Sequence, residues 1–310
     1  MAQPLPLFTS EAFPDHLINY KIPIFRAPRG TRPTALFSVD WEKDHGRWRT
    51  GLEPSYRGIR TATGPLCEML DRLQIPCTWF VEANSRHSEL DMIRSCPEDL
   101  AFLATRPQDE VGLHIHWGNF FGGNGEPRSL QEREQWAEEL KQSTQRLADF
   151  VHKPIASFRS GGHTLVPGLP TILQSLGYRA DLSVEDRRRP LFRYLSSLLG
   201  FTSGPYRPDA TLANQKGDLD ILEIPTSLHL HDFDRLESKL SRFLVPGRNQ
   251  VLSLYIHIDE LTRPQTSQID PARLRGVEKI LLRLQSLMNL EFRTVTSFLA
   301  ATGPAGGSPS

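Results

Sequence analysis

Ionisable side chains recur in this sequence where short apolar runs end. They are Asp40 and Glu42 after ALFSV, His114 and His116 in and after VGLHI, Arg159 after IASF, and His257 after VLSLYI. In extended backbone, residues two apart point to the same side, so the acidic pair and the histidine pair can each direct two polar groups into one cavity. Two imidazoles and a carboxylate are a ligand set for Zn²⁺ that leaves positions for water and substrate. The pattern therefore predicts a Zn²⁺ site.

Each of these residues taken singly has a simpler interpretation. A polar group at a strand end is commonly satisfied by solvent or by neighbouring backbone, and a short motif alone is a weak signal. The pair His229 and His231 is interpreted in this way. Coincidence explains the whole set less well, because a fifth apolar run, 178–184, carries Asp181 and Ser183 in addition.

The elements that must position these side chains follow from hydrophobic periodicity. From Thr34 onward, short β-like runs alternate with longer helical patterns, which indicates parallel β/α units and an α/β fold. In a β/α barrel the carboxyl edge of the strands is where active sites form. The predicted strands are residues 35–39, 77–81, 111–115, 155–158, 178–184, 220–224, 251–256 and 291–295.

Two helices have the clearest signals. Residues 129–151 begin with Ser129 and Glu132 at capping-box spacing and continue with an apolar face, and Asp270 followed by Pro271 opens a second helix. The stretch 186–217 has several Gly and Pro residues and is predicted to be a long insertion that covers a site.

Length and composition favour a single barrel domain. The 310 residues carry 36 Lys and Arg against 36 Asp and Glu, so the chain lacks the basic patch of a nucleic-acid protein. We expect an N-terminal extension over residues 1–30, a barrel over 31–302 and a disordered tail over 303–310. The three cysteines are expected to be reduced packing residues. The run of arginines 187–189 is interpreted as a solvated loop, with a phosphate of the substrate as its alternative partner.

The N-terminal residues suggest where the chain works. Residues 1–10 lack the basic start and apolar stretch of a secretory signal, and no run reaches the roughly 20 apolar residues of a transmembrane helix. The expectation is a cytoplasmic protein without a transmembrane segment.

Six segments in order carry a family resemblance: FSVDWE, EVGLHIHWGN, FRSGG, DLSV, LEIP and YIHIDEL. They resemble the successive motifs of the polysaccharide deacetylases, carbohydrate esterase family four, between about Thr34 and Phe298. The resemblance implies a distorted β/α barrel of about seven parallel strands. It also implies hydrolysis of the N-acyl group, N-acetyl above all, of an amino sugar in a glycan or glycan precursor.

Site residues follow from the same resemblance. Asp40 corresponds to the general base, Arg159 to the arginine that orients this base, and His257 to the general acid that protonates the departing amine. The implied cofactor is a divalent metal, Zn²⁺ first, with Co²⁺, Ni²⁺, Mn²⁺ or Fe²⁺ as alternatives. An amide is a poor electrophile with a poor leaving group. Its hydrolysis therefore needs a metal to polarise the carbonyl and activate water, a base to take a proton and an acid to return one.

The first motif departs from the family pattern. The family has two adjacent aspartates, whereas Asp40 is followed by Trp41. The metal-binding carboxylate is therefore expected to be Glu42, with Asp44 as the fallback.

The second motif departs as well. Its histidines are usually four apart, whereas here Gly118 has the fourth position and His116 lies two after His114. Ligation by both histidines is an inference from geometry rather than a motif match. Asn119 is a further candidate, as a weaker ligand or a substrate contact.

Several residues could form the wall of a sugar pocket. Asp181 and His163 are candidate substrate contacts, and an exposed loop position explains His163 equally well. Trp41, Trp117 and Tyr255 could stack on a sugar ring, although aromatic residues beside strand ends are also ordinary core.

Two other functions remain open. A barrel of the same shape can hydrolyse cyclic ureides or imides, in some relatives without metal, which would leave the histidine pair unexplained. A degenerate barrel can instead bind a glycan or a partner protein without catalysis. The retention of Asp40, Arg159 and His257 together argues against this second alternative. The sequence leaves the sugar, the acyl group and the oligomeric state open.

Overall fold

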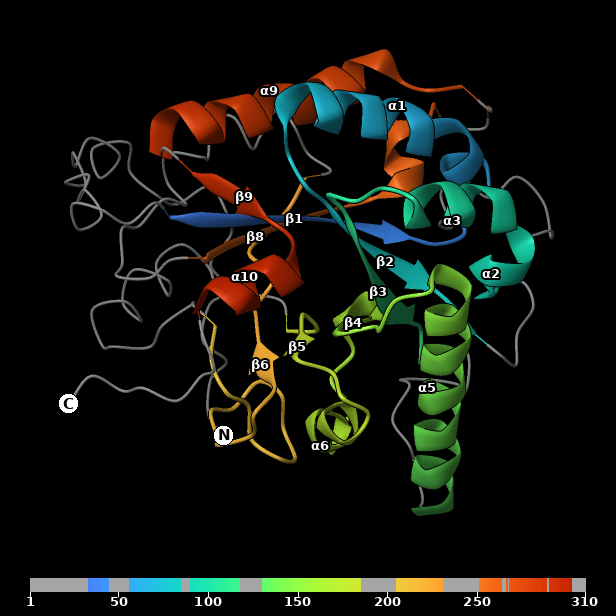
Figure 1. Ribbon diagram of the computed structural model, residues 1–310, viewed down its shortest axis with the longest axis vertical. Coiled ribbons are helices and arrows are strands. Elements are labelled where there is room, and N and C mark those ends of the chain that lie inside the picture. Colours follow the sequence, from blue (N-terminus) through green and yellow to red (C-terminus); the bar gives the residue numbers. More distant parts are fainter. Residues whose placement is uncertain are drawn as a thin grey trace, which may run out of the picture.

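The computed structural model describes residues 33–44, 56–84, 90–117, 130–184, 205–230, 251–263, 266, 268–288 and 290–302. The expected extension over residues 1–30 and the tail over 303–310 lie outside these ranges, as do the arginine run 187–189 and His231. The described residues form a single α/β domain around one curled sheet (Figure 1).

The sheet consists of parallel strands in the order β6-β5-β4-β3-β2-β1-β8-β7, and β9 pairs with the start of β1. The strands are β1 (Thr34–Trp41), β2 (Thr78–Glu82), β3 (Glu110–Ile115), β4 (Ser157–Ser160), β5 (Ala180–Asp181), β6 (Leu222–Glu223), β7 (Leu228–His229), β8 (Val251–His257) and β9 (Glu291–Arg293). Because all the pairings between them are parallel, their carboxyl ends lie at one edge of the sheet.

One continuous segment, residues 222–230, closes the curled sheet. Its first half is β6, which pairs with β5, and the Thr226 amide then donates to the Val184 carbonyl at 2.8 Å. Its second half crosses to β8, where the Ser227 amide donates to the Ser253 carbonyl at 2.8 Å. If this closing segment is counted as one strand and β9 is left out because it lies off the main strand order, seven parallel strands form the barrel wall. This agrees with the prediction of about seven. The prediction of a distorted β/α barrel is confirmed.

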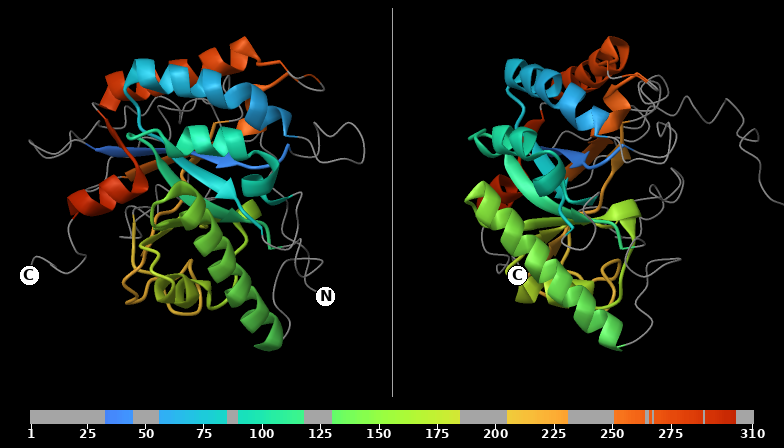
Figure 2. Two further views of the ribbon diagram at one scale, coloured as in Figure 1. Left: turned by 45° about the vertical axis from the view of Figure 1, so that its right-hand side comes forward. Right: turned by 90° about the vertical axis from the view of Figure 1, so that its right-hand side faces the viewer.

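Helices cover the outside of the sheet (Figures 1 and 2). They are α1 (Arg57–Leu73), α2 (Met92–Ser95), α3 (Pro97–Ala104), α5 (Leu130–Val151), α6 (Leu169–Ser175), α9 (Pro271–Met288) and α10 (Val295–Thr302), with 3-10 turns η4 (Gly161–His163) and η5 (Ile258–Leu261). The two helices with clear sequence signals are α5 and α9. The proposed cap at Ser129 lies outside the described residues, as does most of the predicted insertion. In the described part of the chain, no helix is long and apolar enough to cross a membrane.

The alternation along β1 separates the packing side of the strand from the chemical side. Phe37, Val39 and Trp41 are fully buried in the main hydrophobic core. Between them, Ser38 and Asp40 belong to the opposite, inward face. The same strand therefore anchors the barrel to its helices and carries polar groups inside.

The three cysteines are buried and free.

Candidate active site

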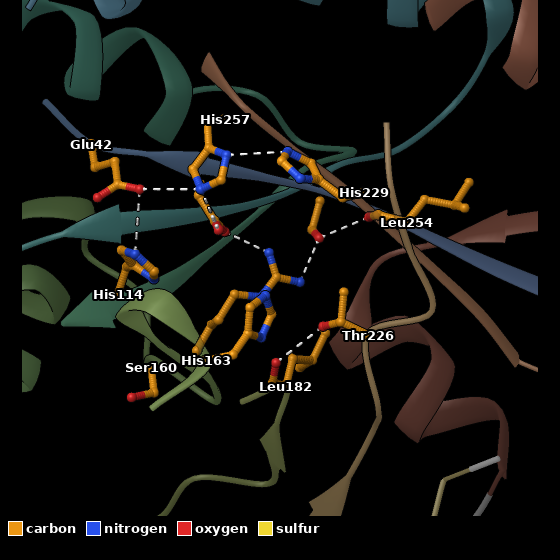
Figure 3. A network of polar contacts seen from close by, with 12 residues as sticks. Glu42, His114, Ser160, His163, Leu182, Thr226, His229, Leu254 and His257 are labelled. Carbon is orange, nitrogen blue, oxygen red and sulfur yellow. Dashed lines mark hydrogen bonds and ion pairs between the residues drawn. The ribbon is translucent and has the colours of Figure 1, made fainter. Parts of the chain in front are cut away.

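Four of the predicted residues meet at the carboxyl edge of the sheet. Asp40 on β1 is in register with His257 on β8, and His114 on β3 is in register with Arg159 on β4. Parallel pairing alone brings each couple side by side, although 217 positions separate Asp40 from His257 in the sequence. The arrangement is shown in Figure 3.

Glu42, His114 and His116 form a compact set, here called the first triad. The Nε2 atoms of the two histidines are 3.2 Å apart, and the Glu42 carboxylate lies 2.6 Å from His116 Nε2 and 3.6 Å from His114 Nε2. Tetrahedral ligands of Zn²⁺ are about 3.3 Å from one another, because each bond is about 2.0–2.1 Å long. The spacing and the donor atoms of the first triad thus suit a single divalent ion.

Gly161 determines where the ring of His116 can lie. A Cβ added to Gly161 would come within 2.3 Å of His116 Cγ and 2.5 Å of Nδ1. Any other residue at this position would overlap the imidazole. The sequence FRSGG therefore contributes a bare backbone against which the second histidine of the first triad packs.

Arg159 and Asp40 form a buried ion pair. Arg159 Nη1 donates to Asp40 Oδ1 at 2.5 Å, and Nη2 donates to Ser38 Oγ at 2.7 Å, which fixes the guanidinium in place. Burial alone would raise the pKa of Asp40, but the charge of Arg159, and then those of His114 and His257, outweigh it and lower this pKa to about 2. Asp40 is therefore an ionised carboxylate at neutral pH.

His257 presents its two nitrogens to different partners (Figure 3). Its Nε2 lies 3.7 Å from both Asp40 Oδ2 and Glu42 Oε1. Burial alone would lower the pKa of His257, but the hydrogen bond with Glu260 and the charges of Asp40 and Glu42 raise it to about 9. The ring therefore carries a proton that it can donate.

On its other side, His257 belongs to a second triad with His229 and Glu260. The sequence interpretation assigned no chemistry to His229 and overlooked Glu260 altogether. His229 Nε2 lies 3.3 Å from His257 Nδ1 and 2.9 Å from Glu260 Oε2. The one sequence signal was the spacing of three between His257 and Glu260, which is that of a capping box and forms one in η5.

Asp181 and His163 lie beside the site rather than in the triads. Asp181 is fully buried; its carboxylate accepts hydrogen bonds from the amide and hydroxyl of Ser183. Burial raises the pKa of Asp181 to about 6. His163 Nδ1 is 3.2 Å from the Ser183 carbonyl, which can only accept, so Nδ1 is the donor.

Both tryptophans expected as stacking candidates belong to the core. Trp41 is fully buried, and its indole N–H donates to Thr63 at 3.0 Å; Trp117 is fully buried against Trp136. Of the two interpretations that the sequence left open, these positions support ordinary core for both residues and correct the expected sugar contact. Tyr255 instead packs against the rings of His163, His229 and His257.

Asp44 is not free to serve as the fallback ligand. Its carboxylate accepts the backbone N–H groups of Gly58 at 2.8 Å and of Arg57 at 3.2 Å, at the start of α1. It therefore caps a helix, which corrects the fallback expectation. Asn119 lies outside the described residues.

Comparisons with known proteins identify the fold. No protein-family model and no curated protein matches the sequence. A solved structure of a Mycobacterium smegmatis protein assigned as a polysaccharide deacetylase shares 13% identity, with a TM-score of 0.59 over 92% of this chain and 96% of the other. PuuE allantoinase shares 15% identity, with a TM-score of 0.60 over 89% and 93%.

A third structure, of a Pseudomonas aeruginosa PAO1 protein assigned as a polysaccharide deacetylase, shares 16% identity, with a TM-score of 0.53 over 85% and 88%. The chain thus has the fold of the polysaccharide deacetylase structures, and it has it over nearly its full length. Since a deacetylase and an allantoinase share this fold, the choice between their activities rests on the side chains of the site.

Proposed function

We propose that this chain is a divergent polysaccharide deacetylase, a divalent-metal-dependent hydrolase that removes the N-acetyl group of an amino sugar. The proposal rests on one observation: the first triad, the Asp40–Arg159 pair and His257 lie together at the carboxyl edge of the sheet. Together these side chains offer a metal position, a base and an acid within a few ångströms of one another.

Glu42, His114 and His116 would hold the metal. When bound, the ion polarises the acyl carbonyl and makes a water molecule more acidic. Asp40 would take a proton from the attacking water as the water oxygen bonds to the carbonyl carbon. Arg159 holds Asp40 ionised before this step, so that the base is ready at neutral pH.

His257 completes the reaction. As the carbon–nitrogen bond breaks, the Nε2 proton of His257 passes to the departing nitrogen, which would otherwise leave as an unstable amide anion. The products are a carboxylic acid and the free amine of the sugar. The raised pKa of His257 keeps that proton on the ring until the leaving group needs it.

A hydrolase of cyclic ureides is the second candidate, because the PuuE allantoinase structure is as similar in fold as the deacetylases are. The first triad favours the deacetylase, since two histidines and a glutamate at metal-ligand spacing serve no purpose in a metal-free site. Metal content therefore separates the candidates.

The test is elemental analysis of the purified full-length protein, in wild type and in the His114→Ala, His116→Ala double variant. His152→Asn is the matched control: this exposed histidine has a φ of 55°, which asparagine tolerates. We expect a divalent metal in wild type and control that is lost in the double variant. A wild type that holds no metal even after zinc is added would favour a metal-free amidohydrolase or a glycan-binding barrel.

The activity test follows acetate release from N-acetylated hexosamine oligosaccharides. We expect Asp40→Asn to lose about 10²–10⁴-fold in rate, the range for removing a general base, while it keeps its circular dichroism spectrum and its metal. Undiminished turnover in Asp40→Asn would contradict the assigned base.

A further inference from the structure

We propose that His229, His257 and Glu260 form a second divalent-cation site, of the Zn²⁺ class, next to the first triad. This site is additional to the one in the proposed function, and its existence does not depend on the deacetylase activity. Its ligand atoms are His229 Nε2, His257 Nδ1 and the Glu260 carboxylate, which lie close enough together to hold one ion.

The two triads share both composition and dimensions. In the second triad the two imidazole nitrogens are 3.3 Å apart, and the carboxylate lies 2.9 Å from one and 3.7 Å from the other. The corresponding distances in the first triad are 3.2, 2.6 and 3.6 Å. Both sets therefore match the roughly 3.3 Å edge of a tetrahedral Zn²⁺ site, with a position left for a further ligand.

The surrounding structure holds the ligands of the second triad in place. The His229 ring stacks on Tyr255, with centroids 4.3 Å apart and planes 16° apart. The backbone N–H of His257 donates to Glu260 Oε2 at 3.1 Å, and Arg273 donates to the Glu260 carbonyl at 2.8 Å. Such outer contacts orient metal ligands before an ion arrives and typically contribute 10–100-fold in affinity.

The ligand side chains of the second triad are largely buried but still partly exposed to solvent. His229 and His257 are 20% and 21% exposed, and Glu260 is 9% exposed. An ion can therefore reach the site from solvent, while the carboxylate that neutralises part of its charge remains mostly buried. Two imidazole nitrogens and one carboxylate favour Zn²⁺ or Co²⁺ over Mg²⁺ or Ca²⁺, which prefer oxygen ligands. An ion at His257 Nδ1 would replace the proton of that nitrogen and leave the proton on Nε2.

Hydrogen bonding is the competing explanation for this geometry. Protons on His229 Nε2 and His257 Nδ1, both directed at the Glu260 carboxylate, would also satisfy the three groups. The two explanations differ in stoichiometry, since only a cation site adds a second equivalent of metal per chain.

The test is metal stoichiometry on apoprotein dialysed against Zn²⁺ or Co²⁺, measured by elemental analysis and, for cobalt, by its visible absorption bands. We expect two equivalents in wild type, one in His229→Gln, Glu260→Gln and one in His114→Ala, His116→Ala. His163→Asn, a nearby histidine outside both triads with a φ of 54°, should keep two. The single variants His229→Gln and Glu260→Gln, each expected to weaken one equivalent about 10-fold or more, serve if the double variant does not fold.

The outcomes separate the two sites. One equivalent in wild type, lost in the first-triad variant and kept in the second-triad variants, overturns the second site and leaves the proposed function intact. If the first-triad variant instead binds as wild type does while the second-triad variants lose an equivalent, the second site stands and the proposed function fails.

Discussion

At the scale of single residues, Gly161 has an importance that comes from the side chain it lacks. The ring of His116 occupies the space in which a Cβ would stand, at distances of 2.3–2.5 Å. The position of this proposed metal ligand therefore depends on a residue that has no side chain and no charge.

The first prediction concerns this glycine. Gly161→Ala should displace His116 and weaken metal binding about 10–100-fold, the usual effect of losing a contact that orients a ligand. Metal affinity is measured by competition with a chromophoric chelator. Gly64→Ala in α1 is the control, because its Cβ would meet nothing within 4 Å. Unchanged affinity in Gly161→Ala would show that His116 adjusts freely or is not a ligand.

Residue periodicity explains both the success and the failure of the sequence interpretation here. The two-residue repeat of a strand correctly placed Asp40 with Glu42, which both face His257, and His114 with His116, on common faces. The same repeat puts Trp41 on the opposite face from Asp40, and its fully buried ring lies in the core. The contact between Gly161 and His116 could not be predicted, because it joins segments whose separation depends on strand register.

At the scale of elements, helix α1 begins without a local cap. The side chain of Tyr56, the residue before it, makes no capping hydrogen bond to the helix, and the carboxylate of Asp44 accepts the first free N–H groups instead. A negative charge at this end of the helix also interacts favourably with the helix dipole. Asp44 thus ties the end of β1 to the start of α1.

The second prediction distinguishes capping from metal ligation. Asp44→Ala should lower the free energy of unfolding by about 1–2 kcal/mol, as measured in urea, and leave the metal content unchanged. Asp44→Asn should lose less, since its amide oxygen can still accept one of the two N–H groups. A variant that loses metal but keeps its stability would instead make Asp44 a ligand.

Every strand of the sheet except β7 overlaps a strand predicted from the sequence, and the longer elements were placed most accurately. β1, β3, β8, α5 and α9 have enough residues to show a periodicity, and each occurs where the sequence placed it to within a few residues. β7 has only two residues and lies in none of the predicted apolar runs, so His229 was not assigned to the strand edge. Without that strand, the second triad could not be anticipated.

At the scale of the whole molecule, two buried acids lie where the barrel closes. Asp181 on β5 is in register with Glu223 on β6, the first strand of the closing segment. Burial raises the pKa of Asp181 to about 6, and burial together with the charge of Asp181 raises that of Glu223 well above its usual value. Ionisation of both would place two negative charges across this pairing.

The third prediction follows from that pair. Because the folded pKa values exceed those of the unfolded chain, the folded state binds more protons, and the stability from this pair is present below about pH 4 and lost as the pH rises through about 6. Between pH 5 and pH 8, wild type should lose on the order of 1–3 kcal/mol relative to Asp181→Asn, Glu223→Gln. Urea unfolding across this range measures the difference.

The control for that prediction is Asp220→Asn, whose carboxylate is 83% exposed and should leave the pH dependence of stability unchanged. Equal slopes for wild type and the double variant would mean that the two carboxyls keep ordinary pKa values.

The residues of the two triads are also synthesised at different times. Glu42, His114 and His116 all belong to the first half of the chain, whereas His229, His257 and Glu260 belong to its last third. During synthesis on the ribosome, the ligands of the first triad emerge before the closing segment and β8 exist. Under the proposed function, a nascent chain would have its metal ligands early, but it would lack the acid that protonates the departing amine until His257 is added and the barrel closes. The order of translation would then separate metal loading from hydrolysis in time.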